Sequence, residues 1–319
     1  MRSMREQPFH PPDLPIINDK VYHLNLSPGE LAPDIIIVGD PHRVTFIARN
    51  FLRGIDVNKE HRGLRTVTGY TDWGQRVSIT TSGMGTPSLE IVINEIVALH
   101  EIDFQSMERK EEFPTLNVIR VGTSGGLQKD TELGTLVITE YAVGLDNTGL
   151  FYDAPPPDER CVKLEGVVKD ALEGVISENS RFKGRISPYA SKAHPDVVRA
   201  LTESAEELGV NFKRGVTVSN SGFFANQGRS VSRIPPTVPD IDVRLSRTDT
   251  GIEGLRFENM EMEASFLLHF LYPLGHRAGV VCPTIDKRPE EKFLVNYQEK
   301  VKEASRVALN ALRRLREWT

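Results

Sequence analysis

The segment Asn259–Leu274 reads NMEMEASFLLHFLYPL and predicts a buried helix that begins beside two carboxylates. From Ala264 onward, apolar side chains surround nearly the whole helix, which is typical of an internal helix. Glu261 and Glu263 would then enter a crowded interior, where a carboxylate is costly unless donors satisfy it. Amides at the helix N-terminus can supply some donors, and a vicinal diol such as a ribose could supply two more. Because the glutamates are two positions apart, we expect only one of them to face any given pocket.

The composition is that of an ordinary globular chain. Of the 319 residues 39% are hydrophobic, and the net charge of −5 argues against nucleic acid as the main partner. Cys161 and Cys282 are the two cysteines, far apart in sequence, so we expect neither a disulfide framework nor a cysteine metal site. The N-terminus lacks the apolar core of a signal peptide, and no apolar run reaches membrane-spanning length. We therefore expect a cytoplasmic protein that does not bind membranes.

Short apolar runs alternate with helical patterns on both sides of the opening segment, which favours one α/β domain with a central sheet between helices. Residues 1–20 are polar and rich in proline, so we expect an irregular arm before a domain at 21–319. The region 221–254 has little periodicity and is expected to be a functional loop. We expect a C-terminal helix from about Glu290. The predicted strands are 34–39, two antiparallel strands within 62–82, 117–122, 133–140, 212–219 and 277–283.

Three strand-to-turn junctions combine glycine with arginine or hydroxyl groups: GDPHR, TSGMGTPS and RVGTSGG. The carboxyl ends of strands bind ligands in open α/β sheets, and glycine amides beside arginine suit a phosphate-like anion. Most single arginines are surface residues, but Arg120 lies within an apolar strand and is a strong candidate for a buried anion contact. Gly83 and Gly85, taken alone, are better explained as turn residues.

The loop SNSGFFANQGRS (Ser219–Ser230) places aromatic, amide and guanidinium groups close together. Phe223 could stack on a planar ring, while Gln227 and Arg229 could bond to the carbonyls and nitrogens on its edge. The alternative is a polar loop anchored by Phe223 and Phe224.

The ordered motifs VGDPHRV, TSGMGTPSLEIVINEI, VIRVGTSGG and NMEMEAS resemble the trimeric and hexameric class of nucleoside phosphorylases over residues 21–315. The loop FFANQGR resembles the uridine phosphorylase branch of that family. The resemblance implies a nucleoside phosphorylase fold, an α/β domain whose mixed sheet is partly barrel-like. It also implies reversible phosphorolysis of uridine to uracil and ribose 1-phosphate, with inorganic phosphate as co-substrate and no metal or organic cofactor. A homo-oligomer, either a dimer or a trimer of dimers, would share its active sites between subunits.

The resemblance also implies a role for each matching residue. Phosphate would be bound by the Gly39 amide, Arg43, Arg120, Thr123 and, from a neighbouring subunit, Arg62. The ribose would be bound by Glu263, the Met262 backbone and His23 of the neighbour. The base would be bound by Phe223, Gln227 and Arg229, with Ile285 and Arg288 closing the pocket. Catalysis would rest on Arg120, Glu263, Gln227 and Arg229.

The chain departs from the family pattern at several positions. Gly63 stands where some uridine enzymes have a carboxylate that helps to hold a monovalent cation, so we predict no metal ion. Residues 235–254 look like an insertion near the base pocket. Asp286 stands where purine enzymes place a proton donor to the leaving base, and we expect it instead to orient an arginine such as Arg288. Three alternatives stay open: a purine nucleoside phosphorylase, a nucleosidase of the same fold and a non-catalytic nucleoside-binding protein.

Overall fold

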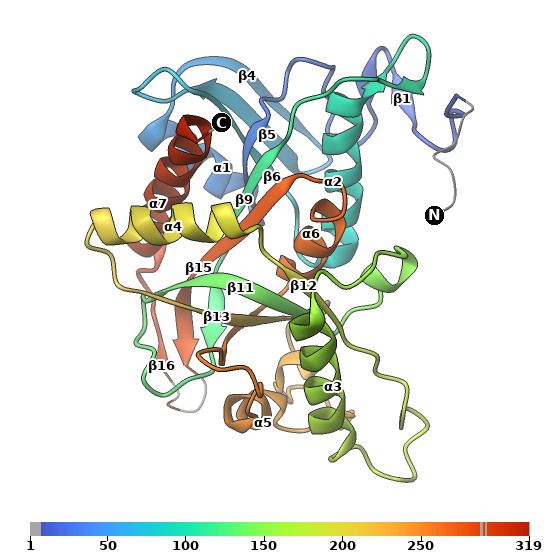
Figure 1. Cartoon of the computed structure of the whole chain (residues 1–319), viewed down its shortest axis with the longest axis vertical. Helices are drawn as coiled ribbons and strands as arrows, with labels where there is room; N and C mark the ends of the chain where they lie inside the picture. The colour runs from blue at the N-terminus through green and yellow to red at the C-terminus, as the bar shows by residue number, and fades with distance from the viewer. Residues whose placement is uncertain (1–7, 288–289, 291, 319) are drawn as a thin grey trace.

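The computed structural model describes residues 8–287, 290 and 292–318, in which strands and helices alternate along the chain (Figure 1). The helices are α1 (Pro41–Phe51), α2 (Thr86–Glu101), the 3-10 helix η1 (Gly149–Phe151), α3 (Glu159–Glu173), α4 (Pro195–Glu207), the 3-10 helix η2 (Ala225–Gln227), α5 (Ile241–Arg247), α6 (Ala264–Leu271) and α7 (Gln298–Glu317). The strands are β1 (Ile16–Ile17), β2 (Lys20–Val21), β3 (Asp34–Val38), β4 (Arg53–His61), β5 (Leu64–Tyr70), β6 (Arg76–Thr81), β7 (Ile102–Asp103), β8 (Glu108–Arg109), β9 (Asn117–Val121), β10 (Ser124–Gly126), β11 (Leu136–Gly144), β12 (Tyr189–Lys192), β13 (Phe212–Ser219), β14 (Phe257–Glu261), β15 (Arg277–Lys287) and β16 (Lys292–Phe293).

One large mixed sheet organises the molecule. Its strand order is β12-β11-β13-β14-β10-β15-β9-β3-β6-β5-β4, and β16 pairs with β15. A further pairing between β11 and β15 closes β11, β13, β14, β10 and β15 into a barrel-like ring. Parallel pairs join β15, β9, β3 and β6, whereas β5 and β6 form the expected antiparallel hairpin. The predicted α/β class and the partly barrel-like mixed sheet are confirmed.

The sequence of each central element explains its place. In β3 the run DIIIV is buried at every position, as expected for a parallel strand covered on both faces. Helix α1 then begins at Pro41, and the side chain of the preceding Asp40 accepts a hydrogen bond from the His42 amide at 2.8 Å. These local signals turn the chain sharply after β3 and place the N-terminus of α1 beside the end of that strand.

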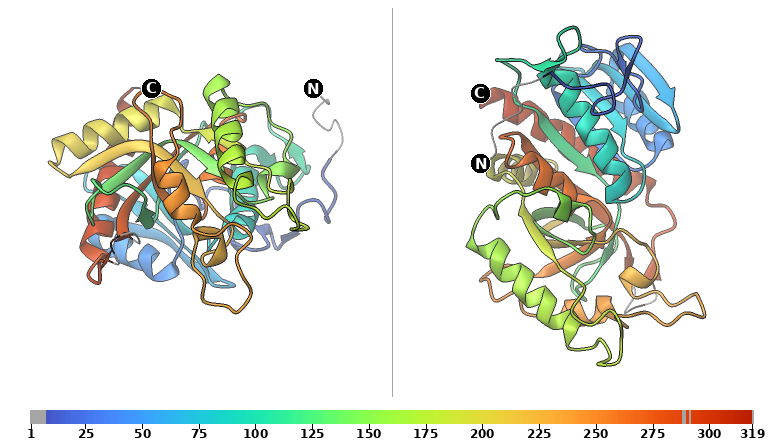
Figure 2. Two further views of the ribbon diagram at one scale, coloured as in Figure 1. Left: turned by 90° about the horizontal axis from the view of Figure 1, so that it is seen from below. Right: turned by 90° about the vertical axis from the view of Figure 1, so that its right-hand side faces the viewer.

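The helices bury their apolar sides in three clusters. Residues of α1, α4 and α7 share one cluster with the sheet, and residues of α2 and α6 share a second. Helices α3 and α5 pack in a third cluster against the ring of strands, at the end of the molecule opposite β4 and β5 (Figures 1 and 2). Helix α6 is therefore enclosed, as the sequence predicted, and six of its residues are buried.

Several local expectations differ from the structure. The last helix begins at Gln298 rather than near Glu290, because β16 first pairs with the end of β15. The region expected to be one long loop contains α5, whose apolar residues pack against β14 and α3. Within the expected irregular arm, β1 pairs with β2. The residues before Glu263 form β14 rather than the start of the helix.

Packing around α6 should carry much of the stability of this fold. Phe266 is fully buried between Tyr152 and Phe270, so Phe266→Ala should lower the free energy of unfolding by about 3–5 kcal/mol. Phe270 is only partly buried on the same helix, and Phe270→Ala should cost clearly less. Urea denaturation of the two variants measures both values, and equal costs would contradict this account of the α6 environment.

Candidate active site

A cavity of ≈ 460 Å³ opens where strands of the sheet end, beside the N-termini of α1 and α6. Of the predicted site residues that the structure describes, all except His23 and Arg62 lie on its walls. The lining residues are Gly39, Asp40, Pro41, Arg43, Met84, Arg120, Thr123, Ser124, Gly125, Phe223, Gln227, Arg229, Met260, Glu261, Met262, Glu263, Ile285, Asp286 and Phe293.

Arg120 forms the charged centre of this cavity. It lies on β9 and is 4% exposed, which makes its charge costly unless partners surround it. Its Nε donates to Glu261 at 3.1 Å, and its Nη2 donates to Glu263. Burial lowers the pKa of Arg120, but the charges of Glu263 and Glu261 outweigh burial and raise it overall. The guanidinium is therefore a permanent cation.

Both glutamates of the opening segment reach the same arginine, so the expectation that only one would face the pocket is wrong. That expectation placed both residues at the start of one helix. Glu261 instead ends β14, and the chain turns through Met262 before α6 begins at Ala264. The turn brings the two side chains to one side.

The second carboxylate, Glu263, is bound at the entrance to α2 as well. Its Oε1 accepts a hydrogen bond from the Gly85 amide at 2.6 Å. Gly85 has a φ of 85°, a conformation that side chains disfavour, so this glycine does more than end a strand. Burial raises the pKa of Glu263, the positive charge of Arg120 lowers it and the charge of Glu261 raises it, with a net result of about 7.

Arg43 brings a second guanidinium to the end of the cavity near α1. Its Nη1 lies 3.5 Å from the Val121 carbonyl oxygen, at the end of the strand that carries Arg120. Burial and the nearby charge of Arg120 lower the pKa of Arg43. Two arginines that repel each other in this way favour an anion between them. Gly39 and Thr123 line the same part of the cavity.

The part of the cavity wall formed by the loop after β13 combines aromatic and polar groups. The guanidinium carbon of Arg229 lies 3.9 Å from the centre of the Phe223 ring. Arg229 Nη1 donates to Gln227 Oε1 at 2.6 Å and to the Phe223 carbonyl oxygen at 2.7 Å. Asp286 Oδ2 accepts from Arg229 Nη2 at 2.7 Å. The carboxylate thus orients an arginine, as expected, but the arginine is Arg229 from the loop.

Comparison with known proteins places this arrangement in a family. The sequence model of the phosphorylase superfamily matches residues 33–315. The chain belongs to the phosphorylase superfamily. It is 30% identical to a uridine phosphorylase of Thermococcus kodakarensis over 298 residues, which cover 93% of this chain and 87% of the relative. It is 35% identical to a DeoD-type purine nucleoside phosphorylase of Listeria welshimeri over 264 residues, or 83% of this chain and 86% of the relative.

A solved structure supports the same assignment. The crystal structure of a Trypanosoma brucei nucleoside phosphorylase, which shows uridine phosphorylase activity, matches with a TM-score of 0.86 and 28% identity. The match covers 95% of this chain and 100% of the other. The predicted family, its fold and its enzymatic nature are confirmed.

Three residues with predicted roles lie elsewhere or outside the described chain. Arg62 is near the Tyr22 ring, 5.5 Å from the ring centre, and His23 bonds to Glu95 on α2 at 2.7 Å. Neither side chain lines the cavity of its own subunit. Arg288 lies outside the described residues. The roles assigned to Arg62 and His23 required a neighbouring subunit and stay predictions.

Other lining residues had no predicted role. Phe293 and Met84 are 60% and 80% exposed at the cavity, and Phe293 reaches it because β16 folds back on β15. No periodic pattern in the sequence signals that short pairing. Gly125 carries a signal in the TSGG motif: a methyl group added there would lie 2.5 Å from Asp286 Oδ1. Glycine is required for Asp286 to reach Arg229.

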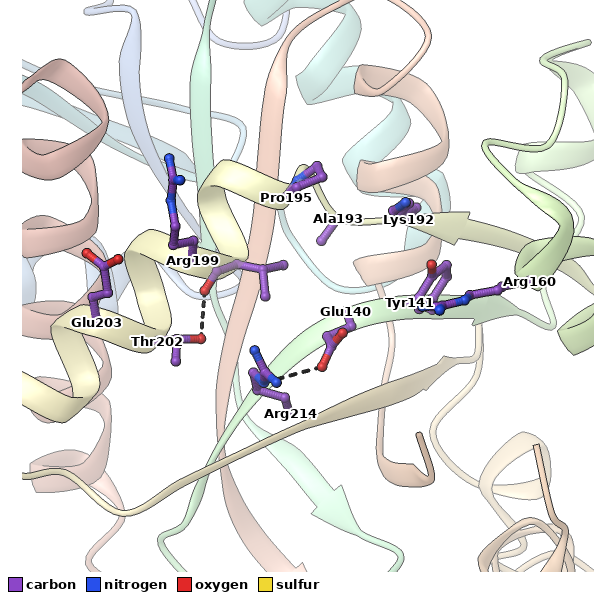
Figure 3. Close-up of a pocket in the computed structure, with 11 residues that line it drawn as sticks. Glu140, Tyr141, Arg160, Lys192, Ala193, Pro195, Arg199, Thr202, Glu203 and Arg214 are labelled. Carbon is purple, nitrogen blue, oxygen red and sulfur yellow. Dashed lines mark hydrogen bonds and ion pairs between the residues drawn. The ribbon is translucent and has the colours of Figure 1, made fainter. Parts of the chain in front are cut away.

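A second cavity of ≈ 450 Å³ lies beside α4, with residues of β11, β12 and β13 on its walls (Figure 3). In Figure 3 Arg214 points toward Glu140, and these two groups are 3.4 Å apart. Lys192, on the same wall, is 2.9 Å from Asp158. None of the predicted site residues lines this second cavity, so we place the candidate site in the cavity around Arg120.

Residues 8–287, 290 and 292–318 contain neither a cluster of metal ligands nor a membrane-spanning helix. No three His, Cys, Asp or Glu residues of this set are grouped as ligands for a metal ion. No helix of this set has both the length and the apolar character needed to cross a membrane.

The ionisation of Glu263 should appear in the pH dependence of stability. Because its pKa rises from 4.5 to about 7 on folding, the folded chain keeps a proton that the unfolded chain has lost between these values. The free energy of unfolding should fall as the pH rises through this window, by on the order of 3 kcal/mol. Urea denaturation between about pH 4.5 and 8 measures the slope, and Glu263→Gln should remove this part of it. An unchanged slope in the variant would show that other groups carry the dependence.

Proposed function

We propose that this chain is a uridine phosphorylase, a pentosyltransferase that reversibly converts uridine and inorganic phosphate to uracil and ribose 1-phosphate in pyrimidine salvage. One observation carries the proposal: a single cavity is lined both by two arginines, Arg43 and Arg120, and by the Phe223, Gln227 and Arg229 group. The arginine pair suits phosphate, and the loop group suits a pyrimidine edge. The uridine phosphorylase of Thermococcus kodakarensis and the trypanosomal structure support the same activity.

Phosphate would bind between Arg43 and Arg120, with the Gly39 amide and Thr123 as further donors. Arg120 has one nitrogen, Nη1, that is buried without a hydrogen-bond partner among the described residues. A buried donor of this kind is costly when empty, and an anionic oxygen would satisfy it. A nucleosidase uses water and needs no such pair of arginines. This difference favours phosphorolysis over hydrolysis.

The ribose would lie over Met262 with its hydroxyls on Glu263. A carboxylate oxygen can accept more than one hydrogen bond, so Glu263 can keep the Gly85 amide and still accept from a sugar hydroxyl. This contact fixes the sugar with its C1′ atom facing phosphate. A phosphate oxygen then forms a bond to C1′ while the bond from C1′ to N1 of uracil breaks, and the bonding electrons leave with the base.

The departing uracil carries a negative charge on its ring until a proton from solvent neutralises it. Arg229 and Gln227 would bind the uracil edge and stabilise that charge, while the base lies against Phe223. Asp286 and the Phe223 carbonyl hold Arg229 in place before the substrate arrives. Phosphate supplies the nucleophile and the arginines stabilise the charges, so we propose that no metal or organic cofactor takes part.

A purine nucleoside phosphorylase is the second candidate, because Asp286 lines the cavity and one relative is a DeoD-type purine enzyme. A proton donor to a purine would need a carboxyl group that is protonated and directed at the base. Asp286 Oδ2 instead accepts a hydrogen bond from Arg229 Nη2 at 2.7 Å, so this oxygen is directed at the arginine rather than at a base. The pairing therefore favours the pyrimidine proposal.

Base release from uridine and inosine, with and without phosphate, tests the proposal. Uridine should be cleaved only when phosphate is present, at least about a hundredfold more efficiently than inosine. Asp286→Ala should lower kcat/KM for uridine by about ten- to a hundredfold because Arg229 loses its anchor. Efficient inosine cleavage that Asp286→Ala abolishes would assign the purine activity instead. Cleavage at the same rate with and without phosphate would indicate a nucleosidase. If neither nucleoside is cleaved, the result would favour a non-catalytic nucleoside-binding protein.

We also propose that the enzyme is a homo-oligomer, a dimer or a trimer of dimers, whose neighbouring subunits complete each site. Arg62 and His23 lie away from the cavity of their own subunit, on a surface where they could reach a neighbour. Tyr22, whose ring centre lies 5.5 Å from the Arg62 guanidinium carbon, is itself 36% exposed and could be covered by a neighbour. A two-fold interface would place Arg62 of each subunit at the partner's phosphate site.

Subunit mixing tests the shared site. Arg62→Ala and Glu263→Ala should each be nearly inactive when assembled alone. A mixed dimer contains one site that lost both residues and one site that kept both, so re-assembled mixtures should regain part of the wild-type activity. Each variant unfolded and re-assembled without the other is the control. Mixtures that form hybrid oligomers yet remain as inactive as the controls would rule out sharing of these two residues.

A further inference from the structure

The carboxylate of Glu261 is occupied by donors from the protein itself. Its Oε1 accepts from the Glu263 amide at 3.0 Å, the Ala264 amide at 2.9 Å and the Ser219 hydroxyl. Its Oε2 accepts from the Glu263 amide at 2.9 Å and from Arg120 Nε at 3.1 Å. Four donor groups, of which the Glu263 amide is shared between the two oxygens, thus surround the carboxylate and leave no position for a substrate hydroxyl.

These contacts fix the orientation of the Arg120 guanidinium. Its Nε edge is held by Glu261, and its Nη2 donates to Glu263. Gly122 and Cys282 close the space behind it, since a methyl group added at Gly122 would lie 3.0 Å from Arg120 Nη2 and 2.7 Å from Cys282 Sγ. Nη1 is the remaining nitrogen, buried and without a partner among the described residues.

We propose that Glu261 is a positioning residue for the phosphorolysis reaction: it holds Arg120 through Nε and thereby reserves Nη1 for the anionic substrate. The inference rests on the proposed function, because it assigns the anion to phosphate. The proposal also assigns different roles to the two glutamates. Glu263 contacts the sugar, whereas Glu261 acts on phosphate through Arg120 without touching either substrate.

The charge of Glu261 has a second effect, on its neighbour. The charged and titratable groups that face Glu263 are Arg120 on β9, Glu261 at the end of β14 and Cys282 on β15, whose thiol pKa burial raises to about 12. After burial and Arg120, the charge of Glu261 is the next influence on the pKa of Glu263, and it raises that pKa. Removing the charge should therefore let Glu263 ionise at lower pH.

Two variants separate the contact from the charge. Glu261→Gln removes the charge and the strong contact to Nε, so the KM for phosphate should rise at least about tenfold while the KM for uridine changes little. The acid limb of its pH–rate profile should also move to lower pH, because without the charge of Glu261 the Glu263 carboxylate stays ionised at lower pH. Glu261→Asp keeps the charge but shortens the side chain, so the KM for phosphate should rise while the acid limb stays in place. Phosphate itself also titrates near neutral pH, but this effect is the same in every sample and cancels when the pH–rate profiles of the variants and the wild type are compared.

Glu258→Gln is the matched control. Glu258 lies on the same strand, is 2% exposed and pairs with Arg256 at 2.7 Å, away from the cavity. It should leave the KM for phosphate and the acid limb at their wild-type values. Calorimetric titration of each protein with phosphate alone gives a readout that does not depend on turnover, and Glu261→Gln should bind phosphate at least about tenfold more weakly.

The outcomes distinguish this inference from the proposed function. Wild-type enzyme that needs phosphate, with unchanged phosphate KM and affinity in both Glu261 variants, would refute the positioning role alone. Equal losses in Glu258→Gln and Glu261→Gln would also refute it, because they would reflect only a missing buried carboxylate. If Glu261→Gln does not fold, Glu261→Asp decides by its phosphate KM and affinity. Wild-type enzyme that releases uracil without phosphate would instead overturn the proposed function.

Discussion

The buried pairing of Arg120 with Glu261 and Glu263 is the constraint on which the rest of the site depends. A single buried guanidinium or carboxylate would be strongly unfavourable, so each of the three requires the other two. Together they also require three separate parts of the chain to meet: β9 supplies the arginine, the end of β14 supplies one glutamate, and the N-terminus of α6 supplies the other. The closed ring of strands makes this meeting possible, because β14 pairs with β10, β10 pairs with β15, and β15 is the parallel neighbour of β9.

Backbone geometry at a few glycines lets the charged groups approach one another. Gly85 donates its amide to Glu263 from a conformation that other residues disfavour, and Gly125 leaves room for Asp286. Gly122 does the same for Arg120 and Cys282. A side chain at Gly122 or Gly125 would push a charged group away from its partner, whereas one at Gly85 would strain the backbone that presents the amide. The glycine-rich motifs thus position side chains as well as backbone amides.

The sequence predicted the parts of this arrangement that depend on local signals. Buried strands such as β3, the enclosed helix α6 and many, but not all, of the residues on the walls of the cavity follow from periodicity, from turn residues and from the family motifs. The joint orientation of Glu261 and Glu263 could not be predicted, because it depends on where β14 ends and the chain turns. The pairing of Asp286 with Arg229 joins positions 57 residues apart, and β16 is a two-residue strand that only tertiary contacts stabilise.

Two arginines of the cavity are held in the same way. Glu261 binds Arg120 and Asp286 binds Arg229, in each case through a carboxylate that contacts one part of the guanidinium. An arginine held in this way needs no reorganisation when an anion arrives, which favours the transition state over the free substrates. In the proposed reaction the paired carboxylate would also lower the net positive charge, so that neither phosphate nor the uracil anion would bind too tightly to leave. A reaction that runs in both directions requires that balance, because each bound anion is a substrate in one direction and a product in the other.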